Sequence, residues 1–343
     1  MNAVAQDTGY RVENGDIARD GDAAIAVWRA SLRNIEGRAA KFEWFYRAAP
    51  EGAQLHVLRP GPGQDIVGTA GVGWRRMRAG GRDLRGGLLA DMAVLAGHRT
   101  LGPAMQLQRT ASERALSVGD LVYGFPNANA VPVVKRLGYA HLGDMVLYVR
   151  ALRHALYLER RLPKPLAHVL GRVIDGAFAI RDLLRNLHRS RLHGHWSAMP
   201  LDLPHPRWSQ PDMLEGVRDA EVLEWRFARS PLASFRFLYF RQEPDAPPAA
   251  WFVCHRDGSV LRIADFGFAA GAAVPHCIAL LARVALAEGC SSLAVECCLP
   301  EAERSALLRS GFRERQRRPI YARWKDPAQA VGTVRFTAFD EDE

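Results

Sequence analysis

The sequence has no apolar run long enough to cross a bilayer, and its first residues lack the apolar stretch of a secretion signal. A spanning helix needs roughly 18 or more apolar residues in succession. Residues 1–21 instead contain acids and other polar side chains. We therefore expect a cytoplasmic chain that is not secreted and does not span a membrane.

Cysteine is scarce and is arranged in no recognisable framework. The chain has five cysteines, all in its C-terminal third and none in a C-x-x-C spacing: Cys254, Cys277, Cys290, Cys297 and Cys298. An odd number in this arrangement favours buried free thiols in a reducing compartment. The sequence predicts neither a disulfide scaffold nor a metal site.

The composition is that of a globular protein with a basic balance. Of 343 residues, 48% are hydrophobic and 24% are charged, which excludes a disordered or fibrous chain and suggests two domains. The formal net charge of +9 fits a polyanionic partner, such as nucleic acid, an anionic membrane or a phosphate-rich cofactor. It also fits a generally basic surface, and no zinc knuckle or basic zipper accompanies it.

The first half alternates between helical and strand patterns. Apolar spacing predicts helices over 22–33, 38–48 and 103–118, and strands over 54–59, 66–78, 84–95 and 121–125. A helix over 127–137 and a closing pair of strands over 139–150 follow. The pattern indicates a mixed α/β unit.

The second half repeats landmarks of the first in the same order. Trp44 and Trp225, Asp91 and Asp265, and Gly138 and Gly311 stand in similar local sequences, 181, 174 and 173 positions apart. Ordered anchors at nearly constant offset indicate a duplication. We predict domains over 1–150 and 196–326, a basic helical connector over 151–195, and a loosely ordered tail over 327–343.

The connector combines strong basic charge with helical apolar spacing. Residues 151–195 contain nine Lys and Arg but only three acids, and 165–187 carries an amphipathic pattern. One interpretation is that its apolar face packs onto the domains, and this is the one we favour. The other is peripheral contact with an anionic membrane face.

The segment richest in chemical information joins a strand to a helix. The strand over 84–95 leads into a loop with Arg99 and Gly102, and the next helix opens near Pro103. A helix N-terminus offers unpaired N–H groups and a partial positive charge, so phosphate binds well there. Gly102 and the small Ala104 allow close approach, and Arg99 adds a charge-assisted contact.

This segment resembles a known motif. The run Arg99, Thr100, Leu101, Gly102, Pro103, Ala104 is similar to the pyrophosphate-binding motif Arg/Gln-x-x-Gly-x-Gly/Ala of the GNAT (GCN5-related N-acetyltransferase) superfamily. In that superfamily the motif follows an apolar strand ending in valine, here Val94. Asn127, Ala130, Gly138 and Tyr139 match a second segment of the family.

The resemblance implies an α/β (α+β) fold of two tandem acyl-CoA N-acyltransferase domains, each a mixed, mostly antiparallel sheet flanked by helices. It implies acetyl-CoA or another acyl-CoA in a cleft between the strands over 84–95 and 121–125. The backbone of Val94 and Leu95 would then bind the pantetheine arm, with Asn127 near it. The loop from Arg99 to Ala104 would hold the pyrophosphate.

Candidate catalytic residues are less clearly marked. Asp91 stands where several family members carry an acid and is a candidate base, although its repeat at Asp265 favours a structural role. The family's usual tyrosine acid is Val134 here. Tyr123 and His141 are candidate substitutes, and each also fits a packing or surface role.

Trp44 and Tyr46 lie on the helix that covers the acceptor site in this family, so they are candidate substrate-binding residues. Aromatic residues at helical spacing also fit a core, and the recurrence of Glu-Trp at 224–225 favours that role.

The leading functional hypothesis is acyl transfer from CoA to an amine, such as an amino sugar or a lipid or polysaccharide precursor. A first alternative resembles the Fem peptidyltransferases, which take aminoacyl-tRNA. Under this alternative alone do we expect a nucleic-acid partner. A second alternative is a non-catalytic CoA-binding scaffold.

The second half has no phosphate loop after its strand over 261–266, so we predict one CoA per chain. Calorimetric titration with acetyl-CoA should give a stoichiometry near one. A stoichiometry of two would contradict the assignment of the cofactor to the first half alone.

Overall fold

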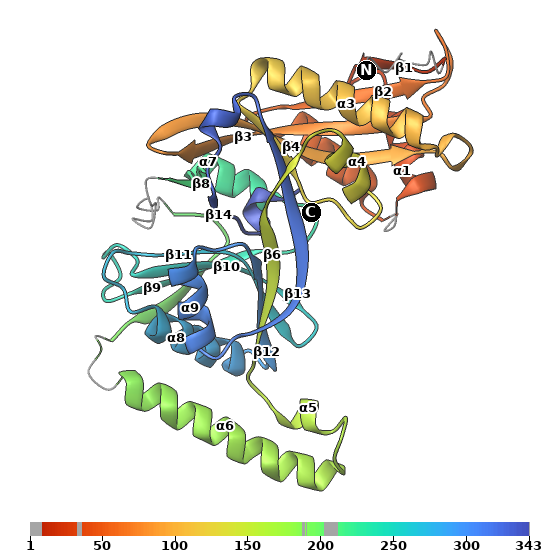
Figure 1. The fold of residues 1–343 in the computed structure, drawn as a ribbon. Coiled ribbons are helices and arrows are strands. Elements are labelled where there is room, and N and C mark those ends of the chain that lie inside the picture. Colours follow the sequence, from red (N-terminus) through yellow and green to blue (C-terminus); the bar gives the residue numbers. More distant parts are fainter. Residues whose placement is uncertain (1–8, 33–35, 187–188, 190, 202–211, 343) are drawn as a thin grey trace.

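A computed structural model of the protein describes residues 9–32, 36–186, 189, 191–201 and 212–342. Within them, fourteen strands form one continuous mixed sheet flanked by helices (Figure 1). The predicted fold class, a mixed α/β protein with a large mixed sheet, is confirmed.

The first half follows the predicted order closely. Its elements are β1 (Arg11–Gly15), α1 (Gly21–Ser31), α2 (Arg38–Phe42), the π-helical turn η1 (Glu43–Arg47), β2 (Ala53–Arg59), β3 (Gly68–Ala79), β4 (Arg82–Val94), the 3-10 turn η2 (Ala96–His98), α3 (Leu101–Val118), β5 (Leu121–Gly124), α4 (Val131–Arg136) and β6 (Ala140–Ala151). The predicted closing pair of strands is wrong, since 140–151 is a single long strand. α4 is shorter than the predicted helix because Asn127 and its neighbours form a turn before it.

The connector and the second half complete the chain. They contain α5 (Ala155–Leu158), α6 (Lys164–Asn186), β7 (His193–Ser197), β8 (Met213–Gly216), α7 (Ala220–Leu223), η3 (Glu224–Ala228), β9 (Arg236–Arg241), β10 (Ala250–Asp257), β11 (Val260–Phe268), α8 (Val274–Ala287), β12 (Ser292–Cys297), α9 (Glu301–Arg309), β13 (Arg313–Trp324), η4 (Pro327–Gln329), β14 (Thr333–Arg335) and η5 (Ala338–Asp340). The connector helix was predicted to end at 187, a position outside the described residues.

The two halves exchange their last strands. The main path of the sheet runs β1-β2-β3-β4-β5-β13-β6-β12-β11-β10-β9-β7. β13, from the second half, lies between β5 and β6, while β6, from the first half, lies between β13 and β12. In Figure 1 these two long strands run side by side from one lobe to the other. Each half therefore fills the place that the other half's sheet leaves open.

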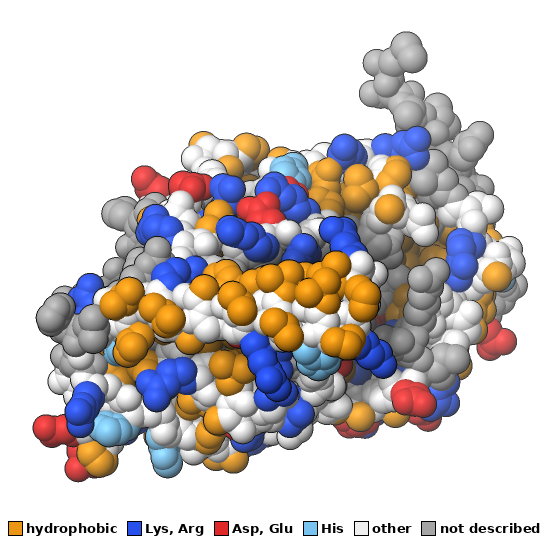
Figure 2. Space-filling model, turned by 90° about the horizontal axis from the view of Figure 1, so that it is seen from below, with side chains coloured by type: hydrophobic (Ala, Val, Ile, Leu, Met, Phe, Trp, Pro, Cys, Tyr) orange, Lys and Arg blue, Asp and Glu red, His pale blue; other side chains and the backbone are white. Residues whose placement is uncertain are grey.

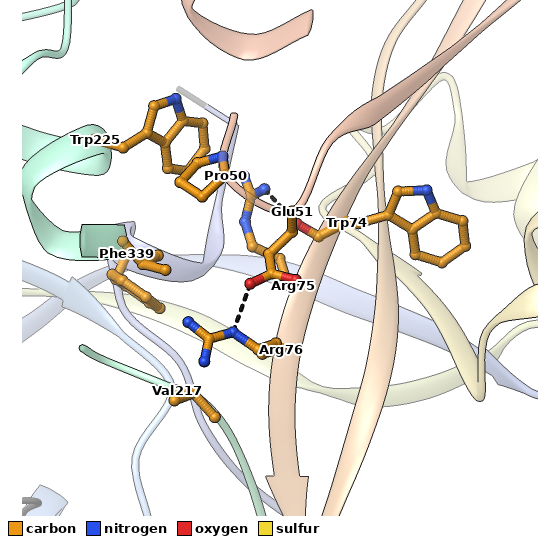
Figure 3. Close-up of a pocket in the computed structure, with 9 residues that line it drawn as sticks. Pro50, Glu51, Trp74, Arg75, Arg76, Val217, Trp225 and Phe339 are labelled. Atoms are coloured by element: carbon orange, nitrogen blue, oxygen red, sulfur yellow. Dashed lines mark hydrogen bonds and ion pairs between the residues drawn. The ribbon is translucent and has the colours of Figure 1, made fainter. Parts of the chain in front are cut away.

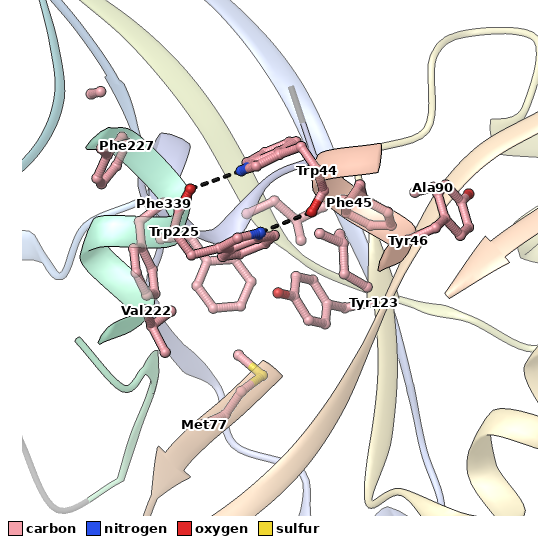
Figure 4. Close-up of a cluster of buried hydrophobic side chains, with 14 of the residues drawn as sticks. Trp44, Phe45, Tyr46, Met77, Ala90, Tyr123, Val222, Trp225, Phe227 and Phe339 are labelled. Carbon is pink, nitrogen blue, oxygen red and sulfur yellow. Dashed lines mark hydrogen bonds between the residues drawn. The ribbon is translucent and has the colours of Figure 1, made fainter. Parts of the chain in front are cut away.

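A pair of tryptophans joins the halves at equivalent positions. Trp44 of η1 and Trp225 of η3 stack with ring centroids 4.9 Å apart and an angle of 15° between the rings. Each indole N–H donates to the other residue's main-chain carbonyl, at 2.7 Å from Trp44 and 2.9 Å from Trp225 (Figure 4). The two halves therefore make equivalent contacts with each other at this tryptophan pair.

Three apolar clusters hold the layers together. One lies between the halves and contains the tryptophan pair, Phe45, Tyr123 and Phe339. A second packs α3 against the first half of the sheet, and a third packs α8 and α9 against the second half. The cluster between the halves covers the sheet face opposite α3.

Two predictions about flanking segments are wrong. The tail predicted over 327–343 is not loose in its described part, 327–342: Phe336, Phe339 and Asp340 are almost fully buried, because the core between the halves takes up its apolar side chains. The apolar face of α6 does not pack onto the domains, since its Val and Leu side chains point outward. No helix among the described residues is long and apolar enough to cross a membrane.

His56 on β2 is a buried imidazole that bonds to nothing in the described chain. Its exposed fraction is 1%, and both ring nitrogens lack a hydrogen-bond partner. Burial, with a smaller effect from Arg114, lowers the pKa of His56 to about 4. The folded protein therefore keeps this ring neutral at a pH where the unfolded chain is protonated.

We expect the free energy of unfolding to fall by about 3 kcal/mol between pH 6.5 and pH 4 through His56 alone, because only the unfolded state takes up the proton there. The contribution is fully present above pH 6.5. In His56→Leu this part of the slope should vanish, while the exposed His195→Leu should keep it. Urea unfolding at several pH values measures both, and equal slopes in the two variants would contradict the assignment.

Candidate functional site

The strands β4 and β5 separate partway along their length. They pair in parallel only from Gly86 to Leu88 on β4, against Leu121–Tyr123 on β5. Beyond that point β4 continues to Val94 on its other neighbour, β3, whereas β5, which pairs with β13 along its other edge, ends at Gly124. The last six residues of β4 thus have no strand partner on the β5 side within the described chain. The two strands that the family resemblance places on either side of the cofactor therefore separate here.

Asp91 lies in this unpaired stretch, in a strained backbone conformation. Its φ of 48° is the only positive value among the described non-glycine residues. The pairing of β3 with β4 shifts register here, between Thr69 and Gly71, so β4 bulges at Asp91. A non-glycine residue in the left-handed region costs about 1 kcal/mol or more. The bulge turns the Asp91 side chain into the space between the halves.

The Asp91 carboxylate is held by three side chains. Its Oδ1 accepts from Lys41 Nζ at 2.8 Å, and its Oδ2 accepts from the Tyr46 hydroxyl at 3.1 Å. Arg38 lies 3.9 Å from Oδ1, and Lys41 also bonds Asp342 at 3.0 Å. The candidate base is therefore the centre of a buried ionic cluster rather than an isolated carboxylate.

Tyr46 reaches Asp91 because β3 carries glycine beneath it. A Cβ on Gly71 would lie 1.9 Å from the Tyr46 hydroxyl, and a Cβ on Gly73 would lie 2.4 Å from the ring of Phe45. Burial, followed by the charge of Asp91, raises the pKa of Tyr46 well above its usual value. The hydroxyl stays protonated and acts as a donor in this cluster.

The N-terminus of α3 follows the open end of β4. The connecting turn η2 is fixed by a hydrogen bond of 2.8 Å between His98 Nδ1 and the Tyr10 hydroxyl. Thr100 is the N-cap of α3, but its side chain bonds no helix N–H group. Gly102, in the first turn of this 18-residue helix, is exposed. The helix end can therefore attract an anion.

The other predicted cofactor residues are partly engaged within the protein. Arg99 folds back, its Nε and Nη2 donating to the Val94 carbonyl at 3.2 and 3.1 Å. The Leu95 N–H donates to the Val67 carbonyl at 2.8 Å. Pro103 is buried and Ala104 partly buried, whereas the side chain of Leu101 lies outside what the structure describes. Asn127 accepts from the N–H groups of residues 129 and 130 in the turn before α4.

The remaining candidates fall into the core or onto the surface. Tyr123 is fully buried, donates to the Asp340 carbonyl at 3.0 Å, and has its pKa raised by burial. His141 is half exposed and bonds Asp144 at 2.9 Å. Trp44 packs on Trp225, as the core interpretation expected. The structure brings Asp91 and Tyr46 together and gives Tyr123, His141 and Trp44 structural contacts.

Sequence reasoning missed the buried acids near the C-terminus, one of which, Asp342, shares Lys41 with Asp91. Asp340 bonds Arg218 at 3.0 Å, Glu341 bonds Arg318 at 2.8 Å, and Asp342 bonds Lys41 at 3.0 Å. Burial raises the pKa of Glu341 to about 7, against the opposing effect of Arg318. The run of four acids over 340–343 was the available signal, although such a run predicts a loosely ordered tail.

The equivalent aspartate of the second half has a matching environment. Asp265 on β11 accepts from Arg218 Nε at 2.8 Å and from the Thr337 hydroxyl at 2.9 Å. It also stands next to a register shift, between β10 and β11. Arg218 bridges Asp265 and Asp340, so both aspartates of the repeat are paired with buried cations.

A small pocket of about 260 Å³ opens where β3 meets the second half (Figure 3). Arg76 at its mouth pairs with Glu51 and with Asp219 of the second half. Behind it, the buried Arg75 stacks over Trp225 with its guanidinium carbon 4.8 Å from the ring centroid, and burial lowers its pKa. A pocket of this size does not accommodate a nucleotide, so the open end of β4 and α3 remains the candidate cofactor site.

Comparison with solved structures identifies the architecture. The chain is similar to a probable N-acyltransferase from Enterococcus faecalis V583 (TM-score 0.64, 8% identity, 93% of this chain and 74% of that one). It is also similar to GCN5-related N-acetyltransferases from Anabaena variabilis (0.63, 10%, 93% and 74%) and Kribbella flavida (0.56, 14%, 92% and 71%). The chain has the GNAT fold. At these identities the similarity defines the GNAT fold alone; no protein-family model and no curated protein matches the sequence.

Within the GNAT fold the C-terminal acids close the space beneath the bulge of β4. The variant Asp340→Asn/Glu341→Gln/Asp342→Asn keeps the packing but removes carboxylates from two buried cations, Arg218 and Lys41, and from the partly exposed Arg318. We expect the free energy of unfolding to fall by more than about 3 kcal/mol, the cost of stripping one partner from a buried pair.

Urea unfolding at neutral pH measures this effect. The matched control, Glu221→Gln/Glu243→Gln/Asp245→Asn, changes three exposed acids and should stay within about 0.5 kcal/mol of the parent protein. A triple C-terminal variant as stable as this control would show that the ion pairs contribute nothing.

Proposed function

We propose that the protein transfers an acyl group from acyl-CoA to an amine, with the CoA bound by the first half. The observation that carries the proposal is the opening between β4 and β5, which leads directly to the N-terminus of α3. The similar fold of solved N-acetyltransferases supports it.

The residues at this opening fit the two parts of a CoA molecule. The β5-facing edge of β4 beyond Leu88 offers main-chain groups to the amides of a pantetheine arm. The first turn of α3, with Gly102 exposed and no acid between Leu95 and Met105, suits a pyrophosphate. Arg99 would exchange its contact with the Val94 carbonyl, which also accepts from the Ser31 hydroxyl at 3.2 Å, for a contact with phosphate.

The reaction class follows from the groups around the bulge. Direct acyl transfer needs an amine placed against the thioester, a route for its proton and a donor for the thiolate. Tyr46 is a protonated hydroxyl beside the bulge, and Asp91 holds it in place. We assign Asp91 to positioning Tyr46 and Lys41, because both of its carboxylate oxygens are already bonded.

The acceptor proposed is an amine on a small molecule, such as an amino sugar or a lipid or polysaccharide precursor. This part of the proposal rests on the sequence resemblance. The other part of the proposal, the use of acyl-CoA as the donor, rests on the separation of β4 from β5 and on the N-terminus of α3.

A second candidate, CoA binding without turnover, is favoured by one observation. The face of the first half opposite α3, where an acceptor would lie, is covered by η3 and η5 with the aromatic cluster between the halves. Release of thiol from acetyl-CoA with a panel of amines separates the two candidates. Saturable CoA binding with no amine-dependent thiol release would favour the scaffold.

Gly102→Asp tests the cofactor site directly. A carboxylate in the first turn of α3 would stand where the pyrophosphate binds, so CoA affinity should fall more than about a hundredfold by like-charge repulsion. Calorimetry with CoA measures the affinity, and thermal melting checks the fold.

The control is Gly332→Asp, where a Cβ would meet nothing within 4 Å. It should bind CoA like the parent protein. A folded Gly102→Asp protein with unchanged affinity would place the cofactor elsewhere.

A further inference from the structure

Helix α6 carries a continuous apolar stripe that no other part of the described chain covers. Its side chains are between 40% and 63% exposed: Leu166, Val169, Leu170, Val173, Ile180, Leu183 and Leu184. They recur every three or four residues and so lie on one face. The exposed Leu156 and Tyr157 of α5 add to the apolar surface here. Figure 2 shows the stripe as an unbroken band across the lower face of the molecule.

The helix is oriented opposite to an ordinary amphipathic helix on a globular domain. Its two acids face the protein. Asp175 bonds His154 at 2.6 Å. Asp182 bonds Arg150 of β6 and its own neighbour on α6, Arg181. Polar contacts thus hold the inner face while leucine and valine face outward. A helix in water places its apolar face against the core, so this arrangement points to a partner outside the chain.

Close packing fixes this orientation. Gly171 lies against α5, where a Cβ would come within 2.5 Å of the Ala155 nitrogen. Phe178 stacks on the ring of His154 with centroids 5.1 Å apart and an angle of 9°. The guanidinium of Arg181 lies over the same phenyl ring at 4.6 Å. The stripe cannot turn inward without breaking all of these contacts.

Basic side chains border the stripe. Exposed cations of the connector include Arg160, Arg161, Lys164, Arg172, Arg189 and Arg191. Figure 2 shows Lys and Arg along both sides of the apolar band. With both acids of α6 turned inward, apolar and positive groups predominate on the outer face, which also carries the exposed His168 bonded to Glu159. That pattern matches an interface with acyl chains at its centre and negative headgroups around it.

We propose that α5 and α6 dock the protein onto an anionic phospholipid bilayer, with α6 lying in the plane of the surface. The helix has 23 residues and is thus about 35 Å long, enough for a broad contact along the headgroups. A second copy is a poorer occupant, because joining two stripes would bring their basic borders together. The proposal does not depend on the acyltransferase assignment.

Flotation of the full-length protein with vesicles tests the proposal. We expect binding to vesicles of phosphatidylcholine with phosphatidylglycerol, little binding to phosphatidylcholine alone, and weakening as salt rises. Val173→Asp/Ile180→Asp should reduce partitioning more than tenfold. Lys164→Glu and Arg172→Glu should each reduce it about fivefold or more. Val118→Asp, at an exposed valine on α3, is the matched control and should bind like the parent protein.

A second measurement locates the contact. Val173→Trp places an indole on the stripe, and its fluorescence should be quenched by brominated lipids in anionic vesicles. Analytical ultracentrifugation without lipid checks for self-association through the stripe. We expect Val173→Asp/Ile180→Asp to leave the oligomeric state of the protein unchanged.

Three results would overturn the proposal. One is absence of binding to anionic vesicles by the folded parent protein. Another is equal loss of binding in Val118→Asp and Val173→Asp/Ile180→Asp. The third is a stable dimer that Val173→Asp/Ile180→Asp dissociates, which would make the stripe an interface between copies.

Discussion

Neither half of the chain completes its own sheet, and this constraint governs the rest of the structure. β5 is followed by β13 and β12 by β6, so each half ends on a strand supplied by the other. Backbone groups left without a partner in a buried strand are costly. The two halves must therefore fold against one another, and the surface between them becomes core rather than a domain boundary. The Trp44–Trp225 pair marks the centre of that surface, with equal contacts from each side.

Because the junction is core, its charges must be neutralised within the protein. Lys41, Arg218 and Arg318 come from separate elements and each meets one of three consecutive acids at the C-terminus. A buried ion pair adds little compared with apolar packing, but removing one partner leaves an uncompensated charge. We therefore interpret the C-terminal acids as groups that determine where the last residues of the chain pack between the halves.

The candidate site uses the same junction. On one side of the sheet, the separation of β4 from β5 leads to the N-terminus of α3 and provides for a phosphate-rich cofactor. On the other side, the bulge at Asp91 turns a carboxylate into the ionic cluster with Lys41 and Tyr46. The strained φ of Asp91 persists because these contacts hold it. Under the proposed acyl transfer, an acceptor would approach from the face that the second half covers, so both halves would define which acceptor fits.

The sequence by itself determined much of the local structure: most helices and strands of the first half, the turn between β4 and α3, the repeat of Trp44 and Asp91 in the second half, and the amphipathic pattern of α6. These follow from periodicity and turn chemistry, which act between near neighbours. Only the tertiary structure decided where the last strands pair, that the acidic end is buried, and that α6 turns its leucines outward. Those outcomes depend on which distant residues supply hydrogen bonds and counter-charges. The sequence pattern of a strand does not specify which strand it pairs with. A run of acids predicts an exposed tail unless the positions of the cations that bond it are known.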